Sequence, residues 1–191
     1  MTYRFLNQPL ENGLYEPEGI YLAPPFRRPA PLLQAWGAHP RFHGDFRYNG
    51  TALKGHPGVD FGLTPGTPLL AVDDGRVVEI SREPGGFERY LKVEHRWGES
   101  FYAYLDDMMV ESGQTIARGE EIATSGIMTA AYAPHLHFAI RIAPYNRFDG
   151  WGGFADPLPY LAAASFIIPD QEEPEFLPPP LLNEERGMRR P

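Results

Sequence analysis

The sequence contains no cysteine, which excludes disulfide bonds and every metal or cluster site that depends on thiolate ligands. A metal bound by this chain must therefore use the side chains of His, Asp or Glu. Basic residues are also few, with 17 Lys and Arg against 25 Asp and Glu, and the formal net charge is −8. This balance disfavours nonspecific binding to nucleic acid or to an anionic membrane surface, since both require a basic patch.

Long apolar runs are missing as well. No stretch of about eighteen apolar residues is present to cross a bilayer, so no transmembrane segment is predicted. Residues 1–10 lack the basic start and apolar segment that mark a secretory signal. We expect a cytoplasmic location by default, or the cell envelope or the extracellular space if the protein is exported by another route. Nothing in the pattern selects an oligomeric state.

Glycine and proline are plentiful, at 20 and 21 residues, and short apolar runs lie between them. The 191 residues, 42% of them hydrophobic, suffice for one domain with a real core. Between residues 64 and 105 these runs alternate with strong turn sequences such as Asp73-Asp74-Gly75, which predicts antiparallel hairpins. Apolar residues then recur every six positions at Val110, Ile116 and Ile122, which predicts two more short strands. We therefore predict an all-β protein.

The two ends differ from the centre in composition. Residues 1–31 are rich in Pro, Gly and aromatic residues without a helical period, and we expect an irregular N-terminal arm that is partly docked on the domain. Residues 32–168 form the predicted β domain. Residues 169–191 are acidic and then proline-rich, and this composition is typical of a solvated, disordered tail.

The strongest chemical signal lies in Ala133-Pro134-His135-Leu136-His137-Phe138. The pattern predicts a strand, and residues two apart in a strand share one face. His135 and His137 therefore point to the same side. Two imidazoles on one face can bind a metal together, or one can bind it while the other transfers a proton. A chance pair of half-exposed strand histidines is the alternative on this motif alone.

A second candidate group is His56 with Asp60. Their spacing of four suits one face of a helix, but Pro57-Gly58 between them predicts a turn that returns His56 toward Asp60 at the start of a strand. Together with His137 they would give zinc two imidazoles and one carboxylate, a net charge of +1 and a fourth position for water. His135 would then lie beside that water and accept its proton or stabilise the developing oxyanion.

These motifs resemble the lysostaphin/LytM-type zinc endopeptidases, which cleave peptide cross-bridges in bacterial peptidoglycan. The likeness rests on His56-Pro57-Gly58-Val59-Asp60, on His135-Leu136-His137-Phe138 and on the spaced strand pattern between them, and it covers about residues 36–161. It implies an antiparallel β-sandwich of short hairpins with a metal groove. It also implies zinc bound by His56, Asp60 and His137, catalysis by His135, and peptidoglycan peptides as the substrate.

One position departs from the family pattern. Members usually carry a second catalytic histidine in a Tyr-Ala-His-Leu strand, whereas this chain has Tyr102-Ala103-Tyr104-Leu105. A tyrosine hydroxyl can donate a hydrogen bond to an oxyanion, but its pKa of about 10 makes it a poor base at neutral pH. We expect a working endopeptidase in which Tyr104 stabilises the transition state. The alternative is a zinc-binding module with little or no activity that binds peptidoglycan or regulates another hydrolase.

A carrier domain for lipoyl or biotinyl groups would show similar glycine-spaced strands, but it needs a lysine at the tip of a hairpin. The lysines of this chain are Lys54, in a loop beside His56, and Lys92, inside a predicted strand. The carrier interpretation is therefore disfavoured. Among the other histidines, we expect His95 to be structural, and we expect His39 and His43 to be exposed or to lie at the rim of the groove.

Overall fold

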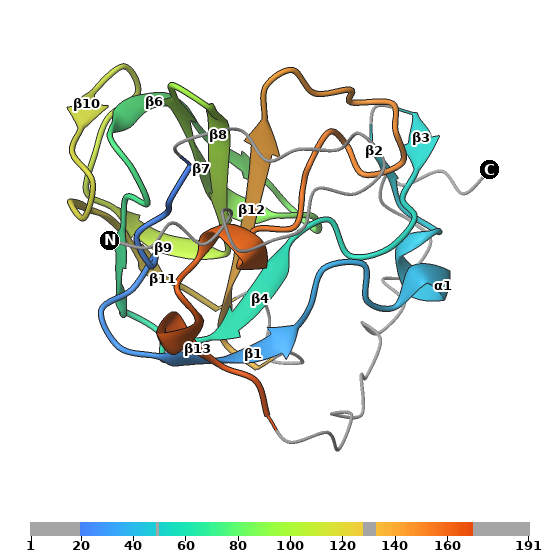
Figure 1. The fold of residues 1–191 in the computed structure, drawn as a ribbon, viewed down its shortest axis with the longest axis horizontal. Coiled ribbons are helices and arrows are strands. Elements are labelled where there is room, and N and C mark those ends of the chain that lie inside the picture. Colours follow the sequence, from blue (N-terminus) through green and yellow to red (C-terminus); the bar gives the residue numbers. More distant parts are fainter. Residues whose placement is uncertain (1–19, 49, 128–132, 170–191) are drawn as a thin grey trace.

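The computed structural model describes residues 20–48, 50–127 and 133–169. Within these ranges the chain is built mainly of strands in three sheets, with one short α-helix, α1 (Pro40–His43) (Figure 1). The prediction of an all-β protein is therefore confirmed. None of the helices in the described part of the chain is long and apolar enough to cross a membrane.

The main sheet has eight strands in the order β10-β6-β7-β8-β12-β4-β1-β13. Their bounds are β1 (Ala30–Gln34), β4 (Val59–Gly62), β6 (Gly75–Glu83), β7 (Glu88–His95), β8 (Gly98–Ala103), β10 (Thr115–Ile116), β12 (His135–Ile142) and β13 (Phe166–Ile167). All neighbours pair antiparallel except β1 and β13, which are parallel. Strand β12 thus lies inside the sheet, hydrogen-bonded to β8 on one side and to β4 on the other.

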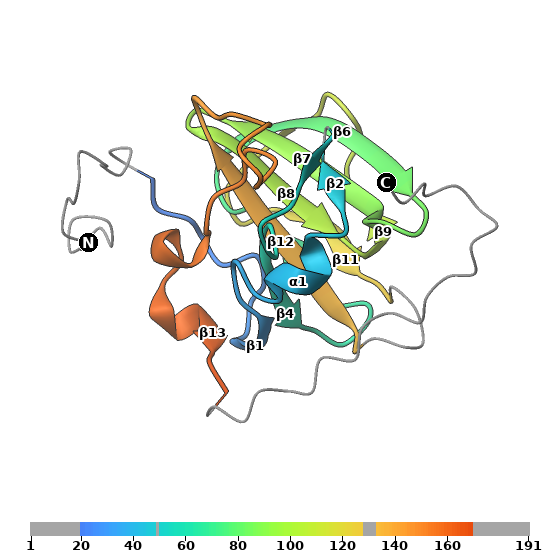
Figure 2. The same ribbon diagram turned by 90° about the vertical axis from the view of Figure 1, so that its right-hand side faces the viewer.

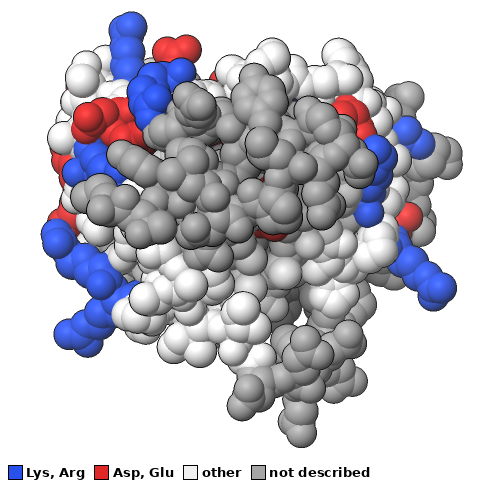
Figure 3. Space-filling view, in the orientation of Figure 1, with Lys and Arg blue, Asp and Glu red and all other residues white. Residues whose placement is uncertain are grey.

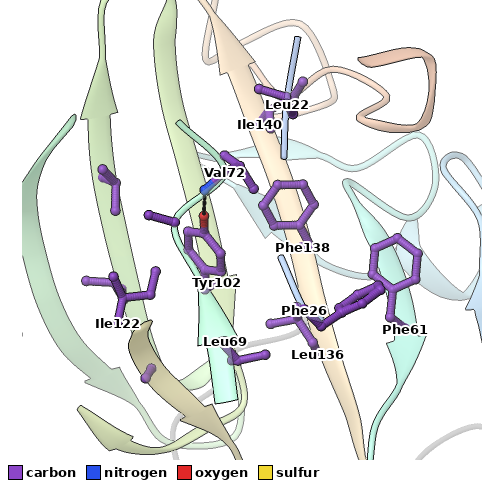
Figure 4. Packing of buried hydrophobic residues seen from close by; sticks show 14 of the residues in the cluster. Leu22, Phe26, Phe61, Leu69, Val72, Tyr102, Ile122, Leu136, Phe138 and Ile140 are labelled. Carbon is purple, nitrogen blue, oxygen red and sulfur yellow. Dashed lines mark hydrogen bonds between the residues drawn. The ribbon is translucent and has the colours of Figure 1, made fainter. Parts of the chain in front are cut away.

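A second sheet packs against the first and completes the sandwich. It has three strands in the order β5 (Pro68–Leu70), β11 (Glu121–Ser125) and β9 (Leu105–Met108). Leu69 and Ile122 from this sheet share one buried cluster with Tyr102 and Phe138 of the main sheet (Figure 4). The Tyr102 hydroxyl accepts a hydrogen bond of 3.1 Å from the backbone N–H of Val72, so the one polar group of this tyrosine is satisfied inside the core.

The alternation of β12 separates the core from the site. Leu136, Phe138 and Ile140 are fully buried in the cluster between the sheets. The intervening residues His135 and His137 therefore point to the opposite face, because successive strand residues alternate. Figure 2 shows α1 and β2 in front of β12 and β4, on the side that these histidines face.

Several short elements cover this face and the ends of the sheets. The strands β2 (Arg47–Tyr48) and β3 (Thr51–Ala52) form a separate hairpin after α1. Two 3₁₀ turns, Leu158–Tyr160 and Ala163–Ser165, follow Asp156. Elements as short as α1, β2 and β3, of two to four residues, leave no hydrophobic period in the sequence.

The described end of the predicted N-terminal arm enters the core. Ile20, Leu22 and Phe26 are at most 2% exposed, and the Leu22 N–H donates to the carbonyl of Tyr160 at 3.0 Å. The first strand, β1, begins at Ala30, two residues before the predicted start of the β domain at residue 32. The rest of the arm, residues 1–19, and the predicted tail from residue 170 onward lie outside the described residues, so the division at residues 31 and 169 stays a prediction.

Charged side chains of the described residues lie mainly toward the edges of the face seen in Figure 3, where Lys and Arg stand close to Asp and Glu. Among the ion pairs of the described residues, Arg27 and Glu121 have an N–O distance of 2.7 Å, and the exposure of both side chains makes the pair worth little stability.

Candidate metal centre

His56 is held in place by residues 35–38, which follow β1. Its Nδ1–H donates to the carbonyl of Ala35 at 3.2 Å. Its backbone carbonyl accepts from Gly37 N–H, and its N–H donates to the carbonyl of Ala38, both at 3.0 Å. Because Nδ1 carries the proton, Nε2 keeps a lone pair, which is the form that binds a metal. The segment 35–38 therefore sets both the tautomer and the position of His56.

Asp60 and His137 are brought together by strand pairing. Asp60 lies on β4, His137 lies on β12, and the two are direct partners in the antiparallel register. Directly opposed residues project to the same face with their Cβ atoms about 4.5–5.5 Å apart. The turn at Pro57-Gly58 then returns His56 to this pair, as the sequence predicted.

Three side-chain atoms converge at this point. His56 Nε2 and His137 Nδ1 are 3.0 Å apart, His137 Nδ1 and Asp60 Oδ1 are 2.9 Å apart, and His56 Nε2 and Asp60 Oδ1 are 3.2 Å apart. Ligands about 2.0–2.1 Å from a tetrahedral zinc are about 3.3 Å from one another, close to these separations. Hydrogen bonds satisfy these atoms poorly, because the Nδ1–H of His137 is the one proton that lies between two acceptors, His56 Nε2 and Asp60 Oδ1. Among the described residues, His56, Asp60 and His137 form the group whose ligand atoms lie close enough together to bind one cation.

Burial and charge favour the metal-binding forms of Asp60 and His137. Both residues and His56 are less than 9% exposed. Burial alone would raise the pKa of the Asp60 carboxyl, but interaction with His56 and the hydrogen bond from His137 hold it well below its usual range. Burial also lowers the pKa of His137, despite the opposing effect of Asp60. These shifts favour a carboxylate at Asp60 and a neutral imidazole at His137, the forms in which both residues bind zinc.

His135 lies beside this group without joining it. Its Nε2 is 4.0 Å from Asp60 Oδ2, and it is 8% exposed. Its Nδ1–H donates to the carbonyl of Ala133 at 2.8 Å, which leaves the lone pair on Nε2, the nitrogen nearer the cluster. The geometry allows His135 to accept a proton at Nε2 from a group bound next to Asp60.

Tyr104 presents its ring to the same histidines. The ring centroids of Tyr104 and His135 are 4.8 Å apart in an edge-to-face arrangement, and the centroid of His137 is 6.3 Å away. The residue lies between β8 and β9 with a φ of 61°, a left-handed conformation that costs a non-glycine residue about 1–3 kcal/mol. Hydrogen bonds from its N–H to Phe87 and from Gly126 to its carbonyl, at 3.2 and 2.8 Å, hold the conformation.

Two further side chains lie next to the site. His43 on α1 is half-buried, with its ring centroid 5.1 Å from that of His56, which fits the expectation of a place at the rim of the groove better than that of full exposure. Burial and the nearby His56 lower its pKa to about 3, and Gln34 donates to its Nε2 at 2.9 Å. Phe87, in the β6–β7 turn, has its ring 5.2 Å from that of His137. Tertiary packing alone brings both residues here.

His95 lies outside the cluster, as predicted. Its Nδ1–H donates to the carbonyl of Asp74 at 2.8 Å, and its Nε2 accepts from the Ser100 hydroxyl at 2.7 Å. The ring stacks on Trp97 with an interplanar angle of 13°. Both nitrogens are therefore occupied by protein groups, which makes this histidine structural.

Because Gly58 has no side chain, the His137 ring can occupy the space beside it. A Cβ at this position would lie 2.7 Å from His137 Cε1, 2.9 Å from His137 Nε2 and 2.8 Å from the carbonyl oxygen of Phe138. His137 Nε2 is buried without a hydrogen-bond partner among the described residues. Packing against Gly58 therefore takes the part that a hydrogen bond usually plays in orienting a ligand histidine.

We expect Gly58→Ala to displace the His137 ring and to weaken zinc binding about 10- to 100-fold, the usual cost of disturbing the support of a ligand. Competition with a chromophoric chelator measures the affinity. Gly119→Ala is the control, because Gly119 has a φ of 82° but no atom within 4 Å of the new methyl group. It should lower the melting temperature and leave the affinity unchanged. An unchanged affinity in Gly58→Ala would contradict the steric argument.

Comparison with known proteins gives a consistent picture. The model of Peptidase family M23 matches residues 54–149, half of the 191-residue chain. An uncharacterized metalloprotease of Haemophilus influenzae is 35% identical over 130 residues, which cover 67% of this chain and 27% of the relative. Peptidoglycan DD-endopeptidase ShyB of Vibrio cholerae is 34% identical over 88 residues, which cover 46% of this chain and 20% of ShyB.

The fold has solved counterparts. The catalytic domain of the antimicrobial peptidase lysostaphin from Staphylococcus simulans matches with a TM-score of 0.55 and 26% identity, covering 69% of this chain and 91% of that domain. The matched part of this chain thus corresponds to nearly all of one catalytic domain, whereas the matches span only 27% and 20% of the two sequence relatives.

Proposed function

The chain belongs to Peptidase family M23, and on that basis we propose that it is a zinc-dependent endopeptidase that hydrolyses peptide bonds in the cross-bridges or stem peptides of peptidoglycan. The observation that carries the proposal is the convergence of His56, Asp60 and His137, whose ligand atoms lie 2.9–3.2 Å apart. Two relatives support the substrate class: ShyB is a peptidoglycan DD-endopeptidase, and lysostaphin is an antimicrobial peptidase. Because peptidoglycan lies outside the cytoplasm, the proposed substrate implies a location in the cell envelope or outside the cell.

Zinc suits this donor set, since two imidazole nitrogens and one carboxylate oxygen are a common catalytic combination for it. When bound, zinc would polarise the peptide carbonyl and lower the pKa of a coordinated water. The protein would hold the ion with His56 Nε2, His137 Nδ1 and Asp60 Oδ1, the three atoms that converge. Burial of these residues strengthens the electrostatic effect of the ion on the substrate.

His135 is the proposed proton acceptor. Its Nδ1–H is occupied by the Ala133 carbonyl, so Nε2 takes up a proton and the resulting imidazolium keeps its hydrogen bond. The same Nε2–H can then be donated to the leaving amine, because one group serves as base and acid in turn. Asp60 Oδ2, 4.0 Å away, stabilises the positive charge in between.

Tyr104 is proposed to stabilise the oxyanion. The ring packs edge-to-face on His135 at a centroid distance of 4.8 Å, so its hydroxyl belongs to the same side of the sheet as the proton acceptor. A neutral phenol donates one hydrogen bond and carries no charge that would compete with the metal. The left-handed backbone at Tyr104 directs the side chain here, which gives the strained conformation a function.

The second candidate function is a zinc-binding module with weak or no activity that binds peptidoglycan or regulates a hydrolase. The observation in its favour is Tyr104, which occupies the position where the family resemblance implies a second catalytic histidine. The two candidates agree on the fold and on the metal. They differ in the rate of hydrolysis when the metal site is full.

The discriminating experiment measures zinc content and the release of soluble muropeptides from purified peptidoglycan. We expect the zinc-loaded protein to release muropeptides, and we expect Tyr104→Phe to do so about 10²- to 10³-fold more slowly with unchanged zinc content, because one oxyanion donor is lost. Tyr104→His, which introduces the residue usual in the family, should be at least as active as the wild type. If zinc-loaded wild type releases no more than chelator-treated protein, the binding module is the correct function.

A further inference from the structure

We propose that Trp151 is a positioning residue for the metal site, acting through Trp36 on the ligand His56; this inference rests on the proposed zinc function. Trp151 lies in the middle of residues 149–153, which we call the brace. The brace contacts β12, which carries His135 and His137. It also contacts Lys54, two residues before His56, and Trp36, in the segment 35–38 that holds His56. It thus connects parts of the chain that are far apart in the sequence.

The sequence of the brace, Asp149-Gly150-Trp151-Gly152-Gly153, dictates its shape. The Asp149 carboxylate accepts hydrogen bonds from the N–H groups of Trp151 and Gly153, at 2.6 and 3.2 Å. The three glycines have φ values of 87°, 66° and 78°, which only glycine adopts without strain. A turn of this kind fixes the backbone that carries the Trp151 ring, outside any strand or helix.

One side of the brace is fixed to β12 by Arg141. The guanidinium is 1% exposed, and its Nε–H donates to the Gly152 carbonyl at 3.0 Å. Its other nitrogens donate to Glu99 Oε2 at 2.9 Å and to the Tyr48 hydroxyl at 2.6 Å. A buried charge of this kind is tolerated only when its donors are paired, so the contacts resist displacement. Arg141 lies four residues from His137 on the same face of the strand.

The other side of the brace contacts the segments around His56. The Gly150 carbonyl accepts from the N–H of Lys54, two residues before the ligand, at 2.9 Å. The rings of Trp151 and Trp36 stack with centroids 4.6 Å apart and an interplanar angle of 29°. Trp36 lies within residues 35–38, the segment whose carbonyl and N–H groups hold both the side chain and the backbone of His56.

His56 depends on this support more than the other ligands do. Asp60 and His137 are direct partners in the ladder between β4 and β12, so the sheet itself fixes their separation. His56 lies before β4, in no strand of the described chain. Its place relative to the other two therefore depends on segment 35–38, and segment 35–38 is packed against the brace through Trp36. Removal of the Trp151 ring leaves one face of Trp36 unsupported.

The test compares two tryptophans in the full chain. Trp151→Ala should weaken zinc binding about 10- to 100-fold, and Trp151→Phe, which keeps a ring against Trp36, should weaken it less. Trp97→Ala is the matched control, because Trp97 is 5% exposed and stacks on His95 away from the cluster. It should lower the melting temperature of the metal-free protein and leave zinc affinity unchanged. Chelator competition gives the affinity, and melting in excess chelator gives the stability.

Each outcome has a defined meaning. Zinc affinity unchanged in Trp151→Ala, or lowered equally in Trp97→Ala, overturns the positioning role while the proposed function stands. Absence of zinc binding by the wild type instead overturns the proposed function. If Trp151→Ala does not fold, Trp151→Leu replaces it, since leucine removes the stacked ring and keeps more of the apolar volume; wild-type zinc affinity in Trp151→Leu would overturn the inference. Ring-nitrogen NMR of the metal-free variants should show a larger change at His56 than at His95.

Discussion

His135→Ala is expected to lower the rate of peptidoglycan hydrolysis about 10²- to 10⁴-fold, the contribution of a general base, while the zinc content stays at that of the wild type. The reason is the division of labour between the two histidines of β12. His137 Nδ1 lies 2.9 Å from Asp60 Oδ1, whereas His135 Nε2 lies 4.0 Å from Asp60 Oδ2 and carries a free lone pair. Single-turnover rates with zinc-loaded protein measure the effect directly.

The control for this prediction is His39→Asn. His39 is exposed, lies before α1 and has a φ of 48°, a conformation that asparagine also tolerates. Its replacement should change neither the rate nor the zinc content. If His135→Ala lost zinc together with activity, His135 would be a ligand, and the assignment of roles within the pair would be wrong.

The second large effect is expected for Asp60→Asn, which keeps the shape of the side chain and removes its charge. Two imidazoles and an amide then face a divalent ion in a buried site, without the carboxylate that partly neutralises it. We expect the variant to lose zinc during dialysis that leaves the wild type loaded, and its activity to fall to that of chelator-treated protein. Metal analysis by mass spectrometry, together with muropeptide release, checks both parts.

Asp106→Asn provides the comparison, because Asp106 is an exposed acid on β9 whose contact with Arg89 is 3.9 Å long. It should retain zinc and full activity. Retention of one zinc per chain by Asp60→Asn, with activity close to wild type, would remove Asp60 from the ligand set and leave the site with two histidines.

The part of the site that could be predicted from the sequence is the part that local rules determine. Alternation along β12 places His135 and His137 on one face and Leu136 on the other. The Pro57-Gly58 turn returns His56 toward Asp60. The order of the two motifs supports the family resemblance, and the match to Peptidase family M23 confirms it. The catalytic roles of His135 and Tyr104 stay predictions.

The rest depends on contacts between distant segments, which no local pattern encodes. His43 comes to lie against His56 because α1 lies in front of β4 and β12 (Figure 2). The hydrogen bond of 3.0 Å from Arg141 to Gly152 depends on a turn whose place relative to β12 the sequence does not specify. The exact start of β1 is likewise set by its parallel pairing with β13, some 130 residues later.

The burial of Ile20, Leu22 and Phe26 bears on how this protein can be divided. The family match begins at residue 54, but these three side chains and β1 complete the interior, and the segment that holds His56 lies at 35–38. A recombinant fragment cut at the edges of the match would lose the Phe26 ring that packs on Phe61 at a centroid distance of 5.0 Å, and it would lack the carbonyl that orients one ligand imidazole. The smallest piece worth expressing therefore starts at residue 20 or earlier.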